Sequence, residues 1–455
     1  TAANFPDANF RAYLEETYDK DGYVIAEAVT EIYCQGRGIK DLTGIERFPN
    51  LCELNCSGNE LTKLSIDSAN LRKLSCYGNK LTVLDVSDCP NLSYLDCDGN
   101  SVGTLDVSKN PALEMLYCAD NGLRTLDVSK NTSLTLLYCA YNKLTALDVS
   151  KNTALIELNC GDNSLPTLDV SKNLALETLY CDNNKLEKLD VSNNTRLEKL
   201  DCSYNQLTVI YLPGTKAETN VLSRIATFFA PATYADETNT VALTELDCSG
   251  NYLSEIDASS CKNLEVLICM KNNKSLTVIV DQLDRVALTT IGTENVKVRD
   301  TTGIQSGTEV SGRILSADVA QMTLVNGSGK VVRTTWGVEG AYRFVAVPAG
   351  TYTLKLSDGI NEKEYQVTIS DTGVTGLPDN IPLAKLGDVN MDGVVDVYDL
   401  QRLYEHATQL NVLEGYYALT LADINGSGNA ETNMQALFEQ LTKTSKEGID
   451  SAKTG

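Results

Sequence analysis

The chain has 455 residues, more than one hydrophobic core usually organises, and carries a formal net charge of -23. Binding to nucleic acid or anionic lipid needs clustered Lys and Arg, so this charge argues against both partners. A single histidine, His406, argues against His-dependent catalysis, and no apolar run is long enough to span a bilayer.

The first 30 residues predict a cap in front of a repeat array. The opening TAANFPDANF lacks the charged and then apolar pattern of an export signal, so we expect a chain from which such a signal has been removed. The stretch NFPDANFRAYLEETYDKDGYVIAEAV is typical of an amphipathic helix, and the end of a solenoid needs such a cover. We therefore predict a helical cap over residues 1–30.

Cysteines recur with a step of 21 residues almost throughout, and this period predicts a solenoid over residues 31–300. The ladder comprises Cys34, Cys56, Cys76, Cys97, Cys118, Cys139, Cys160, Cys181, Cys202, Cys248 and Cys269. In the unit LTLLYCAYNKLTALDVSKNTA, at residues 134–154, apolar residues alternate around the cysteine, which predicts a short strand in each coil.

The ladder thiols have two interpretations, a packed interior column or a column of disulfides or metal thiolates. We favour inert buried thiols, because Cβ atoms in a parallel register point the same way and a disulfide needs them turned together. Cys52, Cys89 and Cys261 lie off the ladder and are the better candidates for available thiols.

Two polar columns accompany the ladder. An asparagine follows each ladder cysteine by three residues from the second unit onward, and Arg37 replaces it in the first unit. A side-chain amide both donates and accepts, so this column can satisfy the buried backbone of a bend. The LDVS strings place Asp85, Asp106, Asp127, Asp148, Asp169 and Asp190 in a second column. We expect each Asp to accept an N–H in its own turn; a cation-binding stripe is the alternative.

The repeated LxxLxCxxNxL and LDVS strings resemble the leucine-rich repeats of bacterial surface proteins, specifically their cysteine-laddered, internalin J-like branch, over roughly residues 30–285. The resemblance implies a solenoid of α/β-type coils with a parallel β-sheet on its concave side, and partner binding as the activity. An irregular insert near residues 212–245 interrupts the ladder, and the sequence leaves open whether it is a degenerate unit or a loop.

Strand side chains alternate, so the residue before each ladder cysteine should point out of the concave face. From this row we predict ligand contacts by Asp96, Tyr117, Tyr138, Asn159, Tyr180 and Asp201, with Tyr77, Tyr141 and Tyr204 two residues further out. Tyrosines beside acids and amides suit a protein or a glycan ligand. The alternative is that tyrosine merely suits half-exposed strands.

Residues 301–385 change to alternating short strands and turns, which predicts an all-β sandwich. The string GAYRFVAVPAGTYTLKL resembles the carboxypeptidase-regulatory-like, or transthyretin-like, fold. This resemblance implies a spacer domain and no peptidase activity.

Residues 386–455 contain a calcium-loop motif in GDVNMDGVVDVYDLQRLYEHA. Hard oxygen ligands at the loop spacing suit calcium, with a backbone carbonyl at the seventh position. The predicted ligands are Asp388, Asn390, Asp392, Val394, Asp396 and Asp399. A second loop offers Asp423, Asn425, Ser427 and Glu431 but lacks the final carboxylate, so we predict that it binds calcium weakly or not at all.

An Asp at the last loop position, followed by a helix, resembles a dockerin, a small α-helical module that binds a cohesin partner. The resemblance implies cohesin contacts by Val397, Tyr398 and Thr432. The sequence thus predicts a secreted or surface-attached bacterial binding protein that is not an enzyme, does not enter the membrane and is anchored through calcium and a cohesin. The alternatives are a dockerin-borne structural spacer, or a hydrolase of polysaccharide or protein.

Overall fold

The computed structural model describes residues 3–18, 26–214, 241–293, 296–300, 303–305, 308–315, 319–338, 341–357, 362–370, 373–377 and 380–382. Contacts divide the chain into two units, the first comprising Thr1–Leu264 and Lys271–Asp281 and the second Glu265–Met270 and Gln282–Gly455. The central part of the insert, both calcium loops and the predicted cohesin contacts lie outside the described residues.

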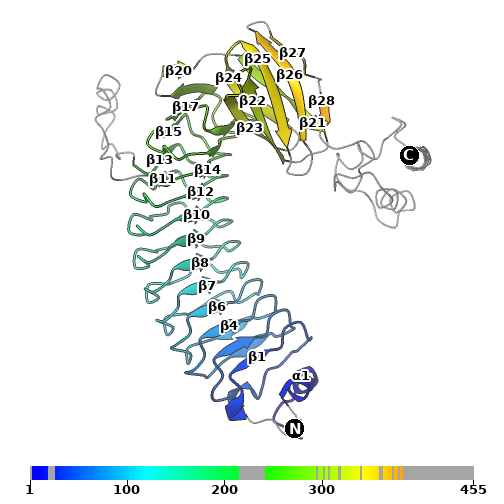
Figure 1. Ribbon diagram of the computed structural model, residues 1–455. Coiled ribbons are helices and arrows are strands. Elements are labelled where there is room, and N and C mark those ends of the chain that lie inside the picture. Colours follow the sequence, from blue (N-terminus) through cyan, green and yellow to red (C-terminus); the bar gives the residue numbers. More distant parts are fainter. Residues whose placement is uncertain are drawn as a thin grey trace, which may run out of the picture. The chain divides into compact units, whose positions relative to one another are not determined.

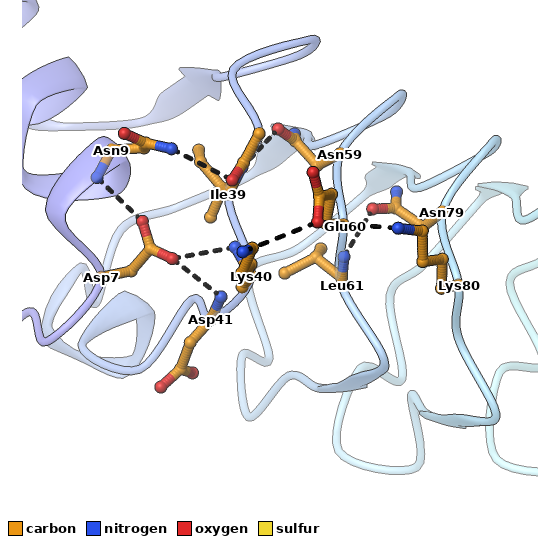
Figure 2. Close-up of polar contacts among 11 residues, drawn as sticks. Asp7, Asn9, Ile39, Lys40, Asp41, Asn59, Glu60, Leu61, Asn79 and Lys80 are labelled. Atoms are coloured by element: carbon orange, nitrogen blue, oxygen red, sulfur yellow. Dashed lines mark hydrogen bonds and ion pairs between the residues drawn. The ribbon is translucent and has the colours of Figure 1, made fainter.

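The amphipathic N-terminal segment forms helix α1 (Ala8–Tyr18), followed by the short helix η1 (Ala26–Ala28). Asp7 Oδ1 accepts the N–H groups of Asn9 and Phe10, each at 2.9 Å, and its Oδ2 accepts the N–H of Lys40 at 2.8 Å; Figure 2 shows the bonds to Asn9 and Lys40. This carboxylate therefore caps α1 and ties it to the first coil. The Arg37 guanidinium lies 2.7 Å from Glu16 and 4.8 Å from the centre of the Tyr13 ring, so the first unit uses this position to hold the helix.

Each coil of the first unit contributes one three-residue strand to a parallel β-sheet (Figure 1). The strands in spatial order are β1 (Glu31–Tyr33), β2 (Glu53–Asn55), β4 (Lys73–Ser75), β6 (Tyr94–Asp96), β7 (Met115–Tyr117), β8 (Leu136–Tyr138), β9 (Glu157–Asn159), β10 (Thr178–Tyr180), β12 (Lys199–Asp201) and β14 (Glu245–Asp247). Because each strand ends just before its ladder cysteine, equivalent residues of successive coils lie side by side.

Separate two-stranded pairings and one turn of helix complete the coils of this unit. They are η2 (Ile45–Arg47), β3 (Lys63–Ser65) with β5 (Val83–Asp85), β11 (Lys188–Asp190) with β13 (Val209–Tyr211), and β15 (Glu255–Ala258) with β17 (Leu276–Val280). All of these pairs are parallel, as expected of a chain that winds in one direction.

Leucines and the cysteine ladder fill the interior. Every ladder cysteine is at most 1% exposed, and burial raises the pKa of the Cys139 thiol to about 12. All fourteen cysteines are described and remain thiols, as expected for the ladder. Off the ladder, Cys52, Cys89 and Cys261 are likewise free thiols; Cys89 and Cys261 are 0% and 2% exposed, and Cys52 is half-buried.

The asparagine column bonds to backbone as expected. Asn142 is typical: its Nδ2 donates to the carbonyls of Cys118 at 2.9 Å and Cys139 at 3.1 Å, and its Oδ1 accepts the N–H of Leu123 at 2.9 Å. Each amide thus joins two neighbouring coils at the bend. The start of this column, at Asn59 and Asn79, is drawn in Figure 2.

A second asparagine column, which the sequence analysis missed, comprises Asn110, Asn131, Asn152, Asn173 and Asn194. All five are fully buried, and each Nδ2 donates to two carbonyls, as Asn152 does to Val128 at 3.0 Å and Asn131 at 2.8 Å. The Oδ1 atoms of this column accept no hydrogen bond. The signal was available, since these asparagines also recur every 21 residues in the string SKN or its variants.

The second unit holds the parallel pair β16 (Val266–Ile268) and β18 (Ala287–Thr289) and the antiparallel pair β19 (Val296–Asp300) and β20 (Gly303–Gln305). Longer strands follow: β21 (Thr308–Leu315), β22 (Val319–Asn326), β23 (Val331–Val338), β24 (Ala341–Val347), β25 (Gly350–Ser357), β26 (Glu362–Ser370), β27 (Gly373–Thr375) and β28 (Asn380–Pro382). Most pair in antiparallel fashion, and alternate residues such as Leu324, Phe344 and Leu354 form their buried core. Within the described ranges, no helix has the length and apolarity that crossing a membrane requires.

Candidate binding surface on the parallel sheet

The outer surface of the parallel sheet is built from four rows of side chains, which we call the strand face. In each strand the middle residue is buried and its two neighbours point outward, as in β8, where Leu137 is buried between Leu136 and Tyr138. The first and third residues of each strand form the first and second rows. The two residues after each ladder cysteine form the third row and the turn row.

The second row contains three of the predicted tyrosines, two of them on neighbouring coils. Tyr117 and Tyr138 lie opposite each other in the register, with ring centroids 5.1 Å apart and planes at 73°. Tyr94, from the first row, joins them at 5.7 Å from Tyr117, and Tyr180 lies two coils beyond Tyr138. All four rings are half-buried, and the Tyr138 hydroxyl donates a hydrogen bond to Glu157 Oε1. Sequence reasoning missed Tyr94 because it considered the residues just before and after each ladder cysteine and not the first residue of each strand.

The polar members of the second row also stabilise the turns that follow them. Asn159 Oδ1 accepts the N–H of Gly161 at 3.2 Å, and Asp201 Oδ1 accepts the N–H of Ser203 at 2.9 Å. Asp96 accepts the N–H of Asp98 in the same way at 3.3 Å. These predicted contact residues therefore have a structural role as well, whereas the tyrosine rings make no such turn contact.

Several carboxyl groups of the strand face are held in partly dehydrated surroundings. Burial, together with the neighbouring Asp96 and Asp120, raises the pKa of Asp98 to about 6, although a hydrogen bond from the Ala119 N–H opposes the shift. Burial and the negative charges of nearby acids likewise raise the pKa of Asp201 to about 6. These two acids stand near opposite ends of the tyrosine cluster.

In every described coil, the turn-row residue has a backbone φ in the left-handed region. Glycine fills this position after several ladder cysteines, as Gly58 and Gly99 do, with φ of 64° and 61°. Tyr141 and Tyr204 occupy it with φ of 53° and 50°, and their side chains are 64% and 47% exposed. The remaining members without glycine are Asp120, Asp162, Asn183 and Lys271.

This placement corrects one prediction. Tyr77, Tyr141 and Tyr204 were expected at one position, two residues beyond the second row, but only Tyr77 is there. Tyr141 and Tyr204 stand one residue further along, in the turn row. The Tyr204 ring lies over the next coil, where a Cβ on Gly250 would come within 2.7 Å of it.

The aspartates of the LDVS column each accept an N–H in their own turn, as expected. In each of its turns the Asp Oδ1 accepts the N–H of the Ser two residues later, at 2.9 Å for Asp127 and Ser129. This bond is the main reason that the pKa of Asp127 is lowered. Among the described residues, no group of three or more His, Cys, Asp or Glu side chains is arranged to hold a metal ion.

Comparisons with known families identify the repeats. Residues 69–110 match Leucine Rich repeats (2 copies), and residues 242–264 match Leucine Rich Repeat. No curated protein matches the sequence.

Solved structures resemble the chain at low identity. The functional domain of InlJ from Listeria monocytogenes, which includes a cysteine ladder, is 23% identical, with 78% of this chain and 94% of that chain covered and a TM-score of 0.39. The internalin InlF of the same organism is 22% identical, with 66% and 92% covered and a TM-score of 0.49. YopM from Yersinia enterocolitica is 23% identical, with 60% of each chain covered and a TM-score of 0.43. The family models thus identify leucine-rich repeats in two segments of the solenoid.

Proposed function

We propose that the protein is a non-catalytic recognition protein that binds a protein ligand through the strand face. The observation that carries the proposal is the cluster formed by the register partners Tyr117 and Tyr138 with Tyr94 beside Tyr117, and with Tyr180 two coils beyond Tyr138. Tyrosine rings supply large contact area at a small cost in side-chain entropy, and they are enriched where proteins bind each other. Here the rings lie on rigid strands, so little ordering is needed on binding.

The same surface argues against the two alternative functions. A spacer has no need of half-buried aromatic side chains gathered on one face, since exposed positions of a solenoid accept any polar residue. A hydrolase needs a nucleophile or a pair of acids around a reacting bond, whereas Asp96, Asp201 and Asp247 of this face each accept an N–H of their own turn.

The test is an array of purified proteins and glycans, including mucins, probed with the full chain and with a variant carrying Tyr117→Ala, Tyr138→Ala and Tyr180→Ala. We expect protein ligands captured by the parent chain to be lost by the variant, because the truncated rings are only half-buried and the fold should survive. Circular dichroism melting checks the fold. Ligands retained by the triple variant would place recognition elsewhere.

For the C-terminal region we propose one calcium site formed by Asp388, Asn390, Asp392, Val394, Asp396 and Asp399, in a dockerin that anchors the protein to a cohesin. The support is the loop spacing in the sequence, with oxygen donors where calcium needs them. Calcium titration of the full chain should reveal one tight site that is lost on combining Asp388→Ala with Asp399→Ala. Two sites of equal affinity would contradict the proposed weak second loop, and a retained tight site would contradict the first.

A further inference from the structure

We propose that the ligand presents a cationic segment, rich in arginine or lysine, to the strand face. This inference rests on the proposed function and names the chemistry of the partner that the same surface recognises. The docking surface is the exposed sheet face around the tyrosine cluster, and charge complementarity selects its occupant.

The charges of the strand face between β6 and β14 are almost all negative. Its four rows contain the carboxylates Asp96, Asp98, Asp120, Glu157, Asp162, Asp182, Asp201, Glu245 and Asp247. Among the described residues of those rows, Lys199 is the one cation, and it lies 3.0 Å from Glu245. The face therefore lacks its own counter-charges, and a positively charged partner would supply them.

Partial burial makes this complementarity stronger than on an open surface. The carboxyl groups of Asp98 and Asp201 are each surrounded by protein and by other acids, which weakens their hydration. A guanidinium placed beside them would replace lost water contacts with charge-assisted hydrogen bonds. Screening by salt is also weaker for such partly buried pairs than for fully exposed ones.

The tyrosine geometry favours a cation over a sugar ring. A sugar stacks best on one flat aromatic surface, but the planes of Tyr117 and Tyr138 meet at 73° and those of Tyr94 and Tyr117 at 46°. Tilted rings instead offer several faces and edges between which a guanidinium can lie. Arginine over a tyrosine face gains a cation–π contribution in addition to its ion pairs.

The turn row adds side chains that the fold does not need. Five earlier or later coils use glycine there, at Gly36, Gly58, Gly78, Gly99 and Gly250, but the coils between them use Asp120, Tyr141, Asp162, Asn183 and Tyr204. Tyrosine with a positive φ is disfavoured, because its Cβ crowds the backbone. These residues therefore extend the acidic and aromatic surface at some cost to folding, beside the tyrosine cluster.

The first experiment measures binding of an arginine octapeptide to the full chain, saturated with calcium, by fluorescence anisotropy. An extended octapeptide reaches about 27 Å, which matches the five coil spacings, about 24 Å, between Asp98 and Asp201. Combining Asp98→Asn with Asp201→Asn should weaken binding at least tenfold. Asparagine can still accept the N–H of Ala119 from the next coil at position 98 and the turn N–H of Ser203 at position 201, so the fold should be retained.

The matched control combines Asp127→Asn with Asp148→Asn. It removes the same charge from acids that likewise each accept a backbone N–H, at 2.9 Å, but these acids lie in the LDVS column outside the strand face. Binding of the octapeptide should stay within twofold of the parent chain. Equal weakening in both double variants would show attraction to net charge alone and would overturn the inference, as would failure of the parent chain to bind the arginine peptide.

The second experiment uses Tyr141→Gly, which replaces a strained residue by the one that other coils carry. Binding should fall at least threefold while the unfolding midpoint does not decrease, so a folding defect cannot explain the loss. Unchanged binding would remove the turn row from the surface. If the array yields instead an acidic protein whose capture depends on Tyr117, Tyr138 and Tyr180, this inference fails while the proposed function stands; a glycan captured in that way would contradict both.

Discussion

Replacing Asn142 tests how the coils are held together. Its amide joins buried backbone of two coils: Nδ2 donates to Cys118 and Cys139, and Oδ1 accepts the N–H groups of Asn121 at 3.1 Å and Leu123 at 2.9 Å. The residue is 9% exposed, so water cannot readily replace these bonds. Asn142→Ala therefore leaves four backbone groups without a partner.

The structure allows a comparison of magnitudes. An unsatisfied buried group costs roughly 1–3 kcal/mol, and the lower value suits a bend close to the surface, so Asn142→Ala should destabilise the solenoid by about 4 kcal/mol. Asn152, in the second column, makes two bonds and has an Oδ1 without a partner. Its replacement by Ala should cost about 2 kcal/mol, because two carbonyls lose a donor. Removal of the Oδ1 atom breaks no hydrogen bond. The exposed Asn193 should tolerate Ala within about 0.5 kcal/mol.

Urea unfolding followed by circular dichroism gives these differences from the midpoints, provided that the slope m stays constant among the variants. Native-state hydrogen exchange adds a local measurement, since the Leu123 N–H should lose protection in Asn142→Ala and keep it in Asn152→Ala. An Asn152→Ala variant that is as unstable as Asn142→Ala would refute the assignment of the larger role to the first column.

Three further predictions follow from the strand face and the ladder. Asp98 and Asp201 have pKa values of about 6, above the ordinary 3.8, so the folded state retains protons that the unfolded chain releases. The unfolding free energy should therefore rise as pH falls from 7.5 to 5, by about 1 kcal/mol for each group after allowance for solvent screening, and urea titrations at both pH values check this. Tyr141→Gly should leave the unfolding free energy unchanged or raise it by up to about 1 kcal/mol, because relief of the left-handed strain offsets the added freedom of the unfolded chain; thermal melting decides. In the native protein Ellman's reagent should modify Cys52 within minutes and leave the ladder thiols unmodified for hours, whereas rapid reaction of several thiols would contradict their burial.

The constant period made the strands and their register predictable from the sequence. A step of 21 residues places Leu116, Leu137 and Leu158 opposite one another, so a single correctly assigned unit determines the interior of the others. The asparagine column was predictable for a similar reason, since an amide repeated at a bend has few roles besides bonding to backbone. The second column at Asn152 was missed because the prediction considered only the asparagines that follow the ladder cysteines, although the asparagine of the SKN string recurs with the same period and is fully buried.

The turn row could not be predicted from Tyr141 itself. Tyrosine is common in half-exposed strands, and nothing in its chemistry indicates a positive φ. The evidence lies in other coils, where Gly58, Gly78 and Gly99 hold the equivalent position two residues after the ladder cysteine. Comparison of the units of one chain therefore reveals a backbone conformation that no single unit indicates.

The same comparison separates folding from recognition. At the buried strand centre every coil from β2 to β14 has leucine, and at the ladder every coil has cysteine, so these positions follow from packing alone. The second row, read from Asn55 to Asp247, changes from coil to coil between amide, hydroxyl, acid and tyrosine. Its amides and acids accept turn N–H groups, but nothing in the packing requires its tyrosines, so their presence reflects what the row contacts outside the chain. The gathering of tyrosines and acids on adjacent coils is thus the feature of this sequence that folding explains least and binding explains best.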